Sequence, residues 1–433
     1  DQFDAIIVGA GVIGAAVGYE LARQGRRTLN IDALPEAGHG PTSGSCAIIR
    51  VHYSTLDGTA FAYDSYFYWK DWAGYLGAPA NAQLAQFHEC GCLVMQTDTN
   101  DQMKRHTDLC QQLDIPFDIW GAAQIRDRLP IYNLDRFAPA KRQDQPGFGE
   151  PTGGALGGAV YFPTAGYISD PKFATQNIQQ AAERHGGEFR FNSTVTRVLK
   201  DASGRVSGVE LGDGTVVSAP VVVNCAGAFS SQLNAMAGAL DDMTIRTKAL
   251  RQEVVHVPAP AGFDFEHDGL VISDSDISCY CRPEKGNHIL VGSEDPECDT
   301  LEIVDPASYN RDFTNQWTTQ AMRMGQRIPT LGIPSRMRGV VDLYDMSDDW
   351  IPIYDKSSVP GFYMAIGTSG NQFKNAPGAG KMMAALIDAC ENGHDHDQDP
   401  MHYHLENIDR PINVGFYSRK RDINRESSFS VLG

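Results

Sequence analysis

The sequence lacks long hydrophobic runs and is short of positive charge. No stretch of its 433 residues approaches the run of about eighteen apolar residues typical of a membrane-spanning helix. Lys and Arg number 36 against 54 Asp and Glu, a formal net charge of −18. This deficit argues against nucleic acid and anionic membrane surfaces as partners, although a buried site with its own local field still admits an anionic small molecule. No signal-peptide pattern stands at residue 1, so we expect a cytoplasmic protein.

The sequence also lacks the C-x-x-C spacing of many zinc and disulfide sites. Its nine cysteines are an odd number and include two C-x-C pairs, Cys90/Cys92 and Cys279/Cys281. Both pairs lie on predicted strands, where alternate residues share one face. We interpret the cysteines as reduced, mostly buried thiols of an intracellular protein.

The end of the sequence offers little for a metal site. Residues 391–399 are polar and read as an exposed turn, so we interpret His394 and His396 as solvated and predict no metal site. Residues 410–433 carry several Arg and Lys residues and are expected on the surface.

The beginning of the sequence holds the clearest pattern. An apolar run at residues 4–8 is followed by Gly9-Ala10-Gly11-Val12-Ile13-Gly14, an Ala-rich helical stretch at 15–23, and a second strand at 27–32 that ends on Asp32. This is the strand, G-x-G-x-x-G, helix, strand and acid order of a dinucleotide-binding βαβ unit.

Each part of this pattern has a mechanical reason. Gly9 allows a tight turn, Gly11 lets a pyrophosphate approach the backbone, and Gly14 lets the helix pack on the strand. The helix N-terminus faces the phosphates, and Asp32 accepts a hydrogen bond from a ribose hydroxyl. The motif alone does not separate FAD from NAD.

The rest of the chain suggests two domains, as its length does. Helices are predicted at residues 61–76, 102–113, 122–129, 171–185, 312–324 and 380–390. After Leu240 the sequence becomes rich in strand patterns, and a second glycine-rich loop follows at 367–380.

Four separated stretches together resemble the D-amino-acid-oxidase-like FAD amine oxidoreductases, the family of sarcosine oxidase, dimethylglycine dehydrogenase and glycine oxidase. They are the Gly9 turn with Asp32, residues 42–50, residues 221–230 and residues 367–380. The resemblance covers residues 1–390 and implies FAD as the cofactor. It also implies an α/β plus β fold, in which a Rossmann-like FAD-binding domain carries an inserted antiparallel β-sheet substrate domain.

The resemblance implies a discontinuous domain layout. FAD-binding pieces are expected at residues 1–85, 155–240 and 339–390, substrate-domain pieces at 86–154 and 241–338, and a tail at 391–433. The cofactor-binding residues carried over from the family are Gly9, Gly11, Val12, Ile13, Gly14, Asp32, Ala33, Ser43, Gly44, Ser45, Val195, Ala226, Gly227, Gly370, Asn371, Gln372, Phe373 and Lys374.

Two cations match the family's contacts to a substrate carboxylate. Arg50 stands where sarcosine oxidase has a carboxylate-binding arginine, and Lys374 matches the second contact. A guanidinium suits the task because it is planar, always charged and able to bind a carboxylate bidentately. Asn371 replaces a histidine of sarcosine oxidase, and Tyr280 is a candidate to line the substrate side; we group these four as candidate catalytic residues.

Three departures from the family carry predictions. The stretch 339–349 has no cysteine for a flavin linkage, and Ala47-Ile48 replaces the linking histidine of dimethylglycine dehydrogenase, so non-covalent FAD is expected. Leu290 aligns with the oxidase lysine that activates dioxygen, although Lys285 is close by in sequence. This slightly favours a dehydrogenase, with an electron acceptor other than dioxygen.

The expected reaction is oxidation of the C–N bond of a secondary or tertiary amino acid, N-methyl or cyclic, by hydride transfer to flavin, followed by hydrolysis of the imine. The expected partner is therefore a small amine that bears a carboxylate. One alternative is a flavin dehydrogenase of 2-hydroxy acids or polyol acids, because Arg50 would serve either acid. The alternative of another class is a non-catalytic FAD-binding assembly factor.

Overall fold

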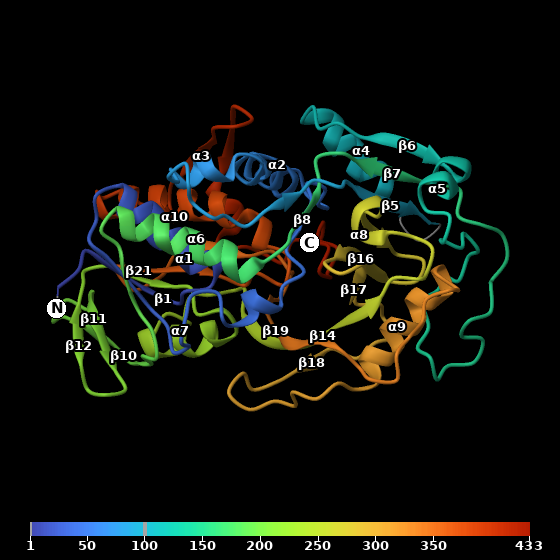
Figure 1. Cartoon of the computed structure of the whole chain (residues 1–433). Coiled ribbons are helices and arrows are strands. Elements are labelled where there is room, and N and C mark those ends of the chain that lie inside the picture. Colours follow the sequence, from blue (N-terminus) through green and yellow to red (C-terminus); the bar gives the residue numbers. More distant parts are fainter. Residues whose placement is uncertain (1, 98–101) are drawn as a thin grey trace.

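The computed structural model describes residues 2–97 and 102–433, which form two large sheets joined by helices (Figure 1). The first sheet has six strands in the order β20-β21-β13-β1-β2-β9. All neighbours in it are parallel except the pair β20 and β21. Its strands are β20 (Ile353–Lys356), β21 (Phe362–Ile366), β13 (Val222–Asn224), β1 (Ala5–Val8), β2 (Thr28–Ile31) and β9 (Glu188–Arg190).

Three helices pack together against this sheet. Helix α1 (Val12–Arg23) contacts both α6 (Pro171–Arg184) and α10 (Ala376–Glu391), and Figure 1 shows the three helices grouped on one side of the sheet. The contact between α1 and α10 is close, because a Cβ added at Gly380 would lie 2.7 Å from the Ala16 carbonyl oxygen. Strands from both ends and the middle of the chain thus build one α/β layer, as the resemblance implied.

The second sheet has nine strands and is mostly antiparallel. Its path is β18-β14-β17-β16-β15-β5-β7-β6, with β19 also paired to β14, and only β5 and β15 run parallel among the pairs described. The strands are β18 (Glu302–Ile303), β14 (Thr247–Pro258), β17 (His288–Ser293), β16 (Cys279–Glu284), β15 (Val271–Asp274), β5 (Cys92–Gln96), β7 (Gly158–Phe162), β6 (Asp118–Gly121) and β19 (Gly339–Ser347).

The two faces of this sheet have different neighbours. Val255, Cys279 and Cys281 point to a core that contains Trp317 of α9 (Asn315–Arg327). Leu250 and Tyr280 point the other way and pack with residues of the FAD-binding side. Because side chains alternate along a strand, the second set forms a wall that faces the first sheet.

The predicted division into domains remains a prediction, but its boundaries can be compared with the sheet to which each strand belongs. β7 and β19 belong to the nine-stranded sheet, whereas the predicted boundaries at 155 and 339 grouped their residues with the FAD-binding pieces. The resemblance implied an inserted antiparallel sheet, and the structure contains one. Strand pairing adds β7 and β19 to this sheet, one strand at each of the two boundaries.

The smaller elements complete the chain. The predicted helix 61–76 is two helices that meet at Asp71, whose carboxylate accepts a hydrogen bond from the amide of Gly74 and begins the second helix. The remaining elements are α2 (Leu56–Lys70), α3 (Trp72–Leu76), α4 (Gln102–Gln112), α5 (Ala122–Arg128), α7 (Ser230–Ala237), α8 (Phe265–Asp268), β3 (Ile48–Ile49), β4 (Phe87–His88), β8 (Gly166–Ile168), β10 (Val195–Lys200), β11 (Val206–Leu211), β12 (Val216–Ser218), β22 (His402–Leu405) and β23 (Arg410–Asn413). Within the described ranges, no helix is both long and apolar enough to cross a membrane.

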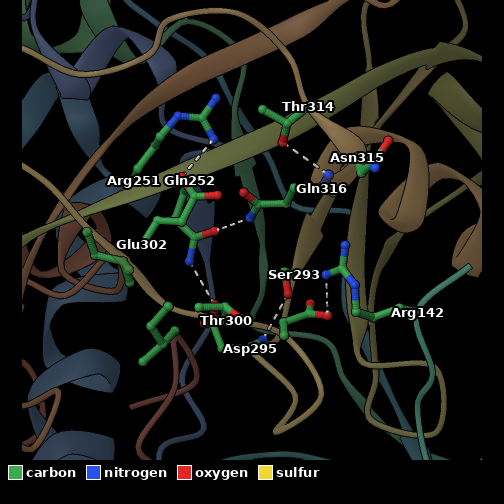
Figure 2. Close-up of a pocket in the computed structure, with 13 residues that line it drawn as sticks. Arg142, Arg251, Gln252, Ser293, Asp295, Thr300, Glu302, Thr314, Asn315 and Gln316 are labelled. Atoms are coloured by element: carbon green, nitrogen blue, oxygen red, sulfur yellow. Dashed lines mark hydrogen bonds and ion pairs between the residues drawn. The ribbon is translucent and has the colours of Figure 1, made fainter. Parts of the chain in front are cut away.

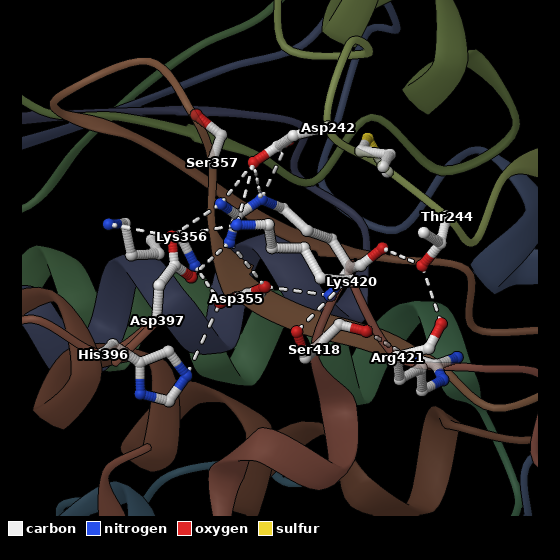
Figure 3. A network of polar contacts seen from close by, with 12 residues as sticks. Asp242, Thr244, Asp355, Lys356, Ser357, His396, Asp397, Ser418, Lys420 and Arg421 are labelled. Atoms are coloured by element: carbon white, nitrogen blue, oxygen red, sulfur yellow. Dashed lines mark hydrogen bonds and ion pairs between the residues drawn. The ribbon is translucent and has the colours of Figure 1, made fainter. Parts of the chain in front are cut away.

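The prediction of a surface tail at 410–433 is wrong. Arg419 is fully buried and pairs with Asp242, Asp355 and Asp397, at 2.6, 3.0 and 2.9 Å (Figure 3). His396, expected in an exposed turn, is also buried and lies 3.5 Å from Asp355. The charge of Arg419 is thus neutralised inside the protein by acids from three other segments, whereas Lys420 beside it is exposed.

Candidate active site

The Gly9 turn leads from β1 into α1 with little room for side chains. Gly9 has φ of 119°, and a Cβ there would lie 2.2 Å from the carbonyl oxygen of Cys225. A Cβ at Gly14 would lie 2.3 Å from the carbonyl oxygen of Gly9. Both positions therefore require glycine for packing, and the helix begins directly at the carboxyl end of the central strand.

The N-terminus of α1 is suited to an anion. Its first turn, Val12–Ala15, consists of apolar residues and glycine, and Gly11 at the N-cap has no side chain to cap it. The hydroxyl of Thr42 accepts a hydrogen bond from the amide of Val12 at 3.1 Å. First-turn amides such as those of Ile13 and Gly14 have no partner within a helix, so this end offers donors and a positive dipole to a pyrophosphate.

Asp32 holds the same turn from the side. Its carboxylate accepts hydrogen bonds from the amides of Ala10 at 2.7 Å and Leu34 at 2.9 Å. The side chain is half-buried and Ala33 beside it is exposed. A carboxylate has about four acceptor positions, so Asp32 retains capacity for ribose hydroxyls after ordering the loop.

Several other predicted cofactor residues lie around this turn, whereas residues 370–374 lie near Arg50. Cys225, just before Ala226 and Gly227, donates its amide to Val8 at 2.9 Å, which brings that loop alongside Gly9. Val195 packs in one cluster with Ile31, the residue before Asp32. Ser43 and Gly44 lie in the short helix Pro41–Gly44, the element that carries Thr42. These residues fit the phosphate and adenosine part of FAD.

Arg50 lies at the other end of this region, just after β3. It is buried, with 7% of its surface exposed, and its guanidinium stacks on the ring of Tyr53 at 4.2 Å. It donates hydrogen bonds to backbone carbonyl oxygens only: those of His52, Val431 at 3.2 Å and Leu432 at 2.7 Å. Among residues 2–97 and 102–433, no carboxylate forms an ion pair with it.

Lys374 is a second buried cation at the same place. It lies in the short helix Phe373–Asn375, and its Nζ donates to the Tyr53 hydroxyl at 3.0 Å and to the Asn371 carbonyl at 2.9 Å. Burial and the nearby charge of Arg50 hold the pKa of Lys374 well below its usual range. In the described part of the chain it too has no carboxylate partner.

Burying two cations without an anion is costly, because each loses its hydration. Tyr53 joins them, with its ring against Arg50 and its hydroxyl on Lys374. Such a pair favours an incoming anion, which would supply the missing counter-charge. The structure thus brings together the two cations that the sequence predicted at separate positions.

Tyr280 and Leu290 form the facing wall. Tyr280 packs with Cys46 and Trp350, its hydroxyl lies 3.8 Å from the Cys46 sulfur, and burial raises its pKa well above the usual range. Leu290 packs against the same cluster. Lys285, the alternative candidate for an oxidase lysine, is exposed in the turn between β16 and β17, so Leu290 is the residue on the site side.

The side chain of Asn371 is hydrogen-bonded within the protein at both its amide nitrogen and its amide oxygen. Its side chain donates to the Trp350 carbonyl at 3.2 Å and accepts from the Gln372 amide at 2.7 Å. Gln372 in turn accepts from the Tyr354 hydroxyl at 2.9 Å. These contacts order the Gly370–Lys374 loop, and the predicted catalytic role of Asn371 stays a prediction.

Comparison with known proteins decides the family. Residues 4–386 match the family model of FAD dependent oxidoreductases, DAO. The chain belongs to this family. The cofactor of this FAD-dependent oxidoreductase is therefore FAD, as expected, and neither of the two linkage residues discussed above is present in its sequence.

Relatives and solved structures agree with the assignment. The chain is 24% identical over 394 residues to N-methyl-L-tryptophan oxidase of Yersinia pestis, covering 88% of this chain and 94% of the relative. Its fold is similar to that of L-proline dehydrogenase from P. horikoshii, with a TM-score of 0.75, 18% identity and coverage of 97% and 98%. It is also similar to glycine oxidase from Geobacillus kaustophilus, with a TM-score of 0.72, 20% identity and coverage of 92% and 97%.

Sequence reasoning missed several residues of this FAD-dependent oxidoreductase. Thr42 caps α1 from thirty residues away, and Tyr53 connects both cations. The largest omission is residues 427–433, which reach Arg50 from the far end of the chain. No local pattern signals these contacts; the one hint in the sequence is the presence of apolar Phe429, Val431 and Leu432 among the serines of this segment.

Proposed function

We propose that this FAD-dependent oxidoreductase oxidises the C–N bond of a secondary or tertiary amino acid, N-methyl or cyclic. The observation that carries the proposal is the pair of buried cations, Arg50 and Lys374, joined by Tyr53 and lacking an acidic partner in the described residues. A carboxylate-bearing substrate supplies what this site lacks.

The protein's own residues act by binding and orientation. Arg50 and Lys374 hold the carboxylate through charge-assisted hydrogen bonds, and Tyr53 keeps the two cations in place. Their positive field lowers the pKa of the substrate amine and so favours its reactive neutral form. Bound FAD would supply the hydride acceptor, and water then hydrolyses the imine product. Positioning and electrostatics are the main contributions of the protein.

The names of similar proteins support this substrate class. N-methyl-L-tryptophan, L-proline and glycine, named for three of them, are all amines that carry a carboxylate. Two of these three are secondary amines. We therefore place N-methyl and cyclic amino acids first among the candidates.

We further propose a dehydrogenase rather than an oxidase. Leu290 packs in the Tyr280 cluster, while Lys285 is exposed in the hairpin turn away from it. A cation near the flavin would stabilise developing superoxide, and Leu290 provides none. Reduced protein is expected to react slowly with dioxygen and faster with a quinone or dye. Hydrogen peroxide formation at the dye-coupled rate would contradict this.

Anaerobic titration tests the reaction. The flavin absorbance of the holoenzyme should bleach with N-methyl or cyclic amino acids and persist with 2-hydroxy acids. Bleaching by hydroxy acids alone would instead support the alcohol-oxidising alternative. No bleaching by any acid, together with stable FAD binding, would support a non-catalytic role.

A further inference from the structure

Residues 427–433, here called the terminal segment, run into the candidate active site. The chain before them is fixed, because Arg421 pairs with Asp349 at 2.8 Å and donates to the Ile351 carbonyl at 2.7 Å. The amide of Asn424 also donates to Asp349, at 3.2 Å. In Figure 1 the end of this segment, marked C, lies beside β16 and β17.

The backbone of the terminal segment occupies the hydrogen-bond donors of Arg50. Nη2 of Arg50 donates to the carbonyl oxygens of Leu432 at 2.7 Å and Val431 at 3.2 Å. The hydroxyl of Ser54 donates to the Gly433 oxygen, and the amide of Val431 donates to Asp295 at 3.4 Å. The donors assigned to a substrate carboxylate are therefore already engaged.

The side chains of the segment fill the adjoining space. Val431 is buried in the cluster of Tyr280 and Trp350, and Leu432 packs against it. Gly433 lies against Tyr53, since a Cβ added to it would be 2.6 Å from that ring. The segment thus contacts both the cation side and the facing wall.

Two partners of Val431 also line a cavity. Leu250, which packs in the Val431 cluster, and Asp295, which accepts its amide, both line a space of about 410 Å³ that reaches α9. Figure 2 shows Gln252 and Gln316 there, with Gln252 donating to Asp295 at 2.7 Å. The segment therefore lies next to this polar cavity as well as next to Arg50.

We propose that the terminal segment is a lid that occupies the carboxylate seat of Arg50 and must be displaced before substrate binds. The proposal rests on the function proposed above for the same site. Carbonyl oxygens are neutral acceptors, so they satisfy the hydrogen bonds of Arg50 without neutralising it or Lys374. A carboxylate adds a charge–charge attraction to both cations and can bind the guanidinium bidentately, so it displaces the lid where a neutral molecule does not.

The lid thereby adds selectivity. A closed state that is favoured over the open one lowers the apparent affinity of every ligand by the open fraction. With an open fraction of roughly 1–10%, within the common range for minor states, the reduction is about 10- to 100-fold. Only a ligand with a negative charge recovers this cost through Arg50.

Deletion of residues 427–433 tests the lid in the holoenzyme. The probes are benzoate, a carboxylate without an oxidisable amine, and benzamide, its neutral counterpart, each followed by perturbation of the flavin spectrum. Deletion should tighten benzoate binding by about 10- to 100-fold. Weaker benzoate binding would overturn the lid and make the segment a wall of the site, and unchanged binding would overturn it as well.

Point variants guard against misfolding of the deletion. Val431→Ser removes a buried contact of the segment and should tighten benzoate binding in the same direction by about threefold or more. Phe429→Ser, its matched control in an exposed position of the same segment, should leave benzoate binding unchanged. Equal effects of the two variants would contradict the proposal.

Hydrogen exchange gives a readout that needs no turnover. In the full-length holoenzyme, saturating benzoate should accelerate amide exchange in residues 427–433, including Val431, and leave the Arg421 anchor unchanged. Slower or equal exchange in the segment would overturn the lid. This outcome is separate from the proposed reaction: if no amine reduces the flavin but benzoate opens the segment, the reaction fails and the lid stands. Absence of benzoate binding in every variant would overturn the lid together with the carboxylate seat.

Discussion

Two buried arginines of this protein lie in opposite surroundings. Arg419 contacts Asp242, Asp355 and Asp397 and is fully neutralised (Figure 3). Arg50 contacts an aromatic ring and backbone carbonyls, and its charge acts on a second buried cation, Lys374, whose pKa it helps to lower. The first arrangement is complete within the chain, whereas we propose that an anion from outside completes the second.

This difference separates a structural cation from a binding one. A buried charge that stabilises the fold must be paired within the fold, because the desolvation cost is otherwise not recovered. Arg419 meets that condition, because it pairs with acids from three other segments of the chain. Arg50 and Lys374 do not meet it within the described residues, and under our proposal a bound carboxylate recovers their desolvation cost. The comparison yields the following expectations, from the largest effect to the smallest.

Arg419→Ala should destabilise the protein more than any other substitution considered. Removing one partner of a buried ion-pair cluster leaves its carboxylates uncompensated and costs about 3–5 kcal/mol. Thermal and denaturant unfolding at fixed FAD concentration measure the loss. Lys420→Ala, the exposed neighbour at 3.8–3.9 Å from the same acids, is the control and should cost less than about 1 kcal/mol. Similar losses of unfolding free energy in the two variants would contradict the structural role of Arg419.

Lys374→Met should impair carboxylate binding and leave stability at or above the wild-type level. A hydrogen bond to a charged group contributes about 1.5–3 kcal/mol, so benzoate affinity should fall by about 10- to 100-fold. Stability should not fall, because the variant removes a buried charge that has no counter-ion in the described structure. A large drop in the melting temperature with unchanged benzoate binding would place Lys374 with the structural cations.

Carboxylate binding should also weaken as pH rises through the pKa of Lys374. Burial and Arg50 lower that pKa, and a bound carboxylate favours the protonated amine, so binding takes up a proton. Above the pKa of the free protein, benzoate Kd should rise by up to about tenfold per pH unit. Glu294 and Asp295, whose pKa values burial raises to about 8 and about 6, also titrate within the measured pH range. The part of the pH dependence of benzoate Kd that Lys374→Met abolishes is due to Lys374. An unchanged pH profile in that variant would exclude Lys374 as its cause.

The sequence predicted the cofactor side better than the substrate side, for a physical reason. Gly9, Gly11, Gly14 and Asp32 lie within one continuous unit, where backbone sterics and the helix end dictate the residue types. The cations of the substrate side were found through resemblance, since nothing local distinguishes Arg50 from a surface arginine. Their surroundings depend on burial, which only the folded chain sets.

The end of the chain shows the limit most clearly. Composition suggested a surface tail, because it is rich in Arg and Lys. Arg419 is nevertheless buried, since acids at 242, 355 and 397 surround it, and Val431 is buried because the Tyr280 wall offers an apolar surface. Both outcomes depend on partners distant in sequence, which residue periodicity does not report.

The central claim is that Arg50 is a carboxylate receptor and not a structural cation. Its most direct test compares Arg50→Ala with wild type on one amino-acid substrate and on an analogue with a neutral group in place of the carboxylate. Truncating a charge-assisted pair in a desolvated site costs about 2–5 kcal/mol, so kcat/KM for the acid should fall by a factor on the order of 10² to 10³. The neutral analogue should be poor with wild type and barely worse with the variant, and FAD content should be unchanged. An equal loss on both substrates would contradict the account and assign Arg50 to the structure.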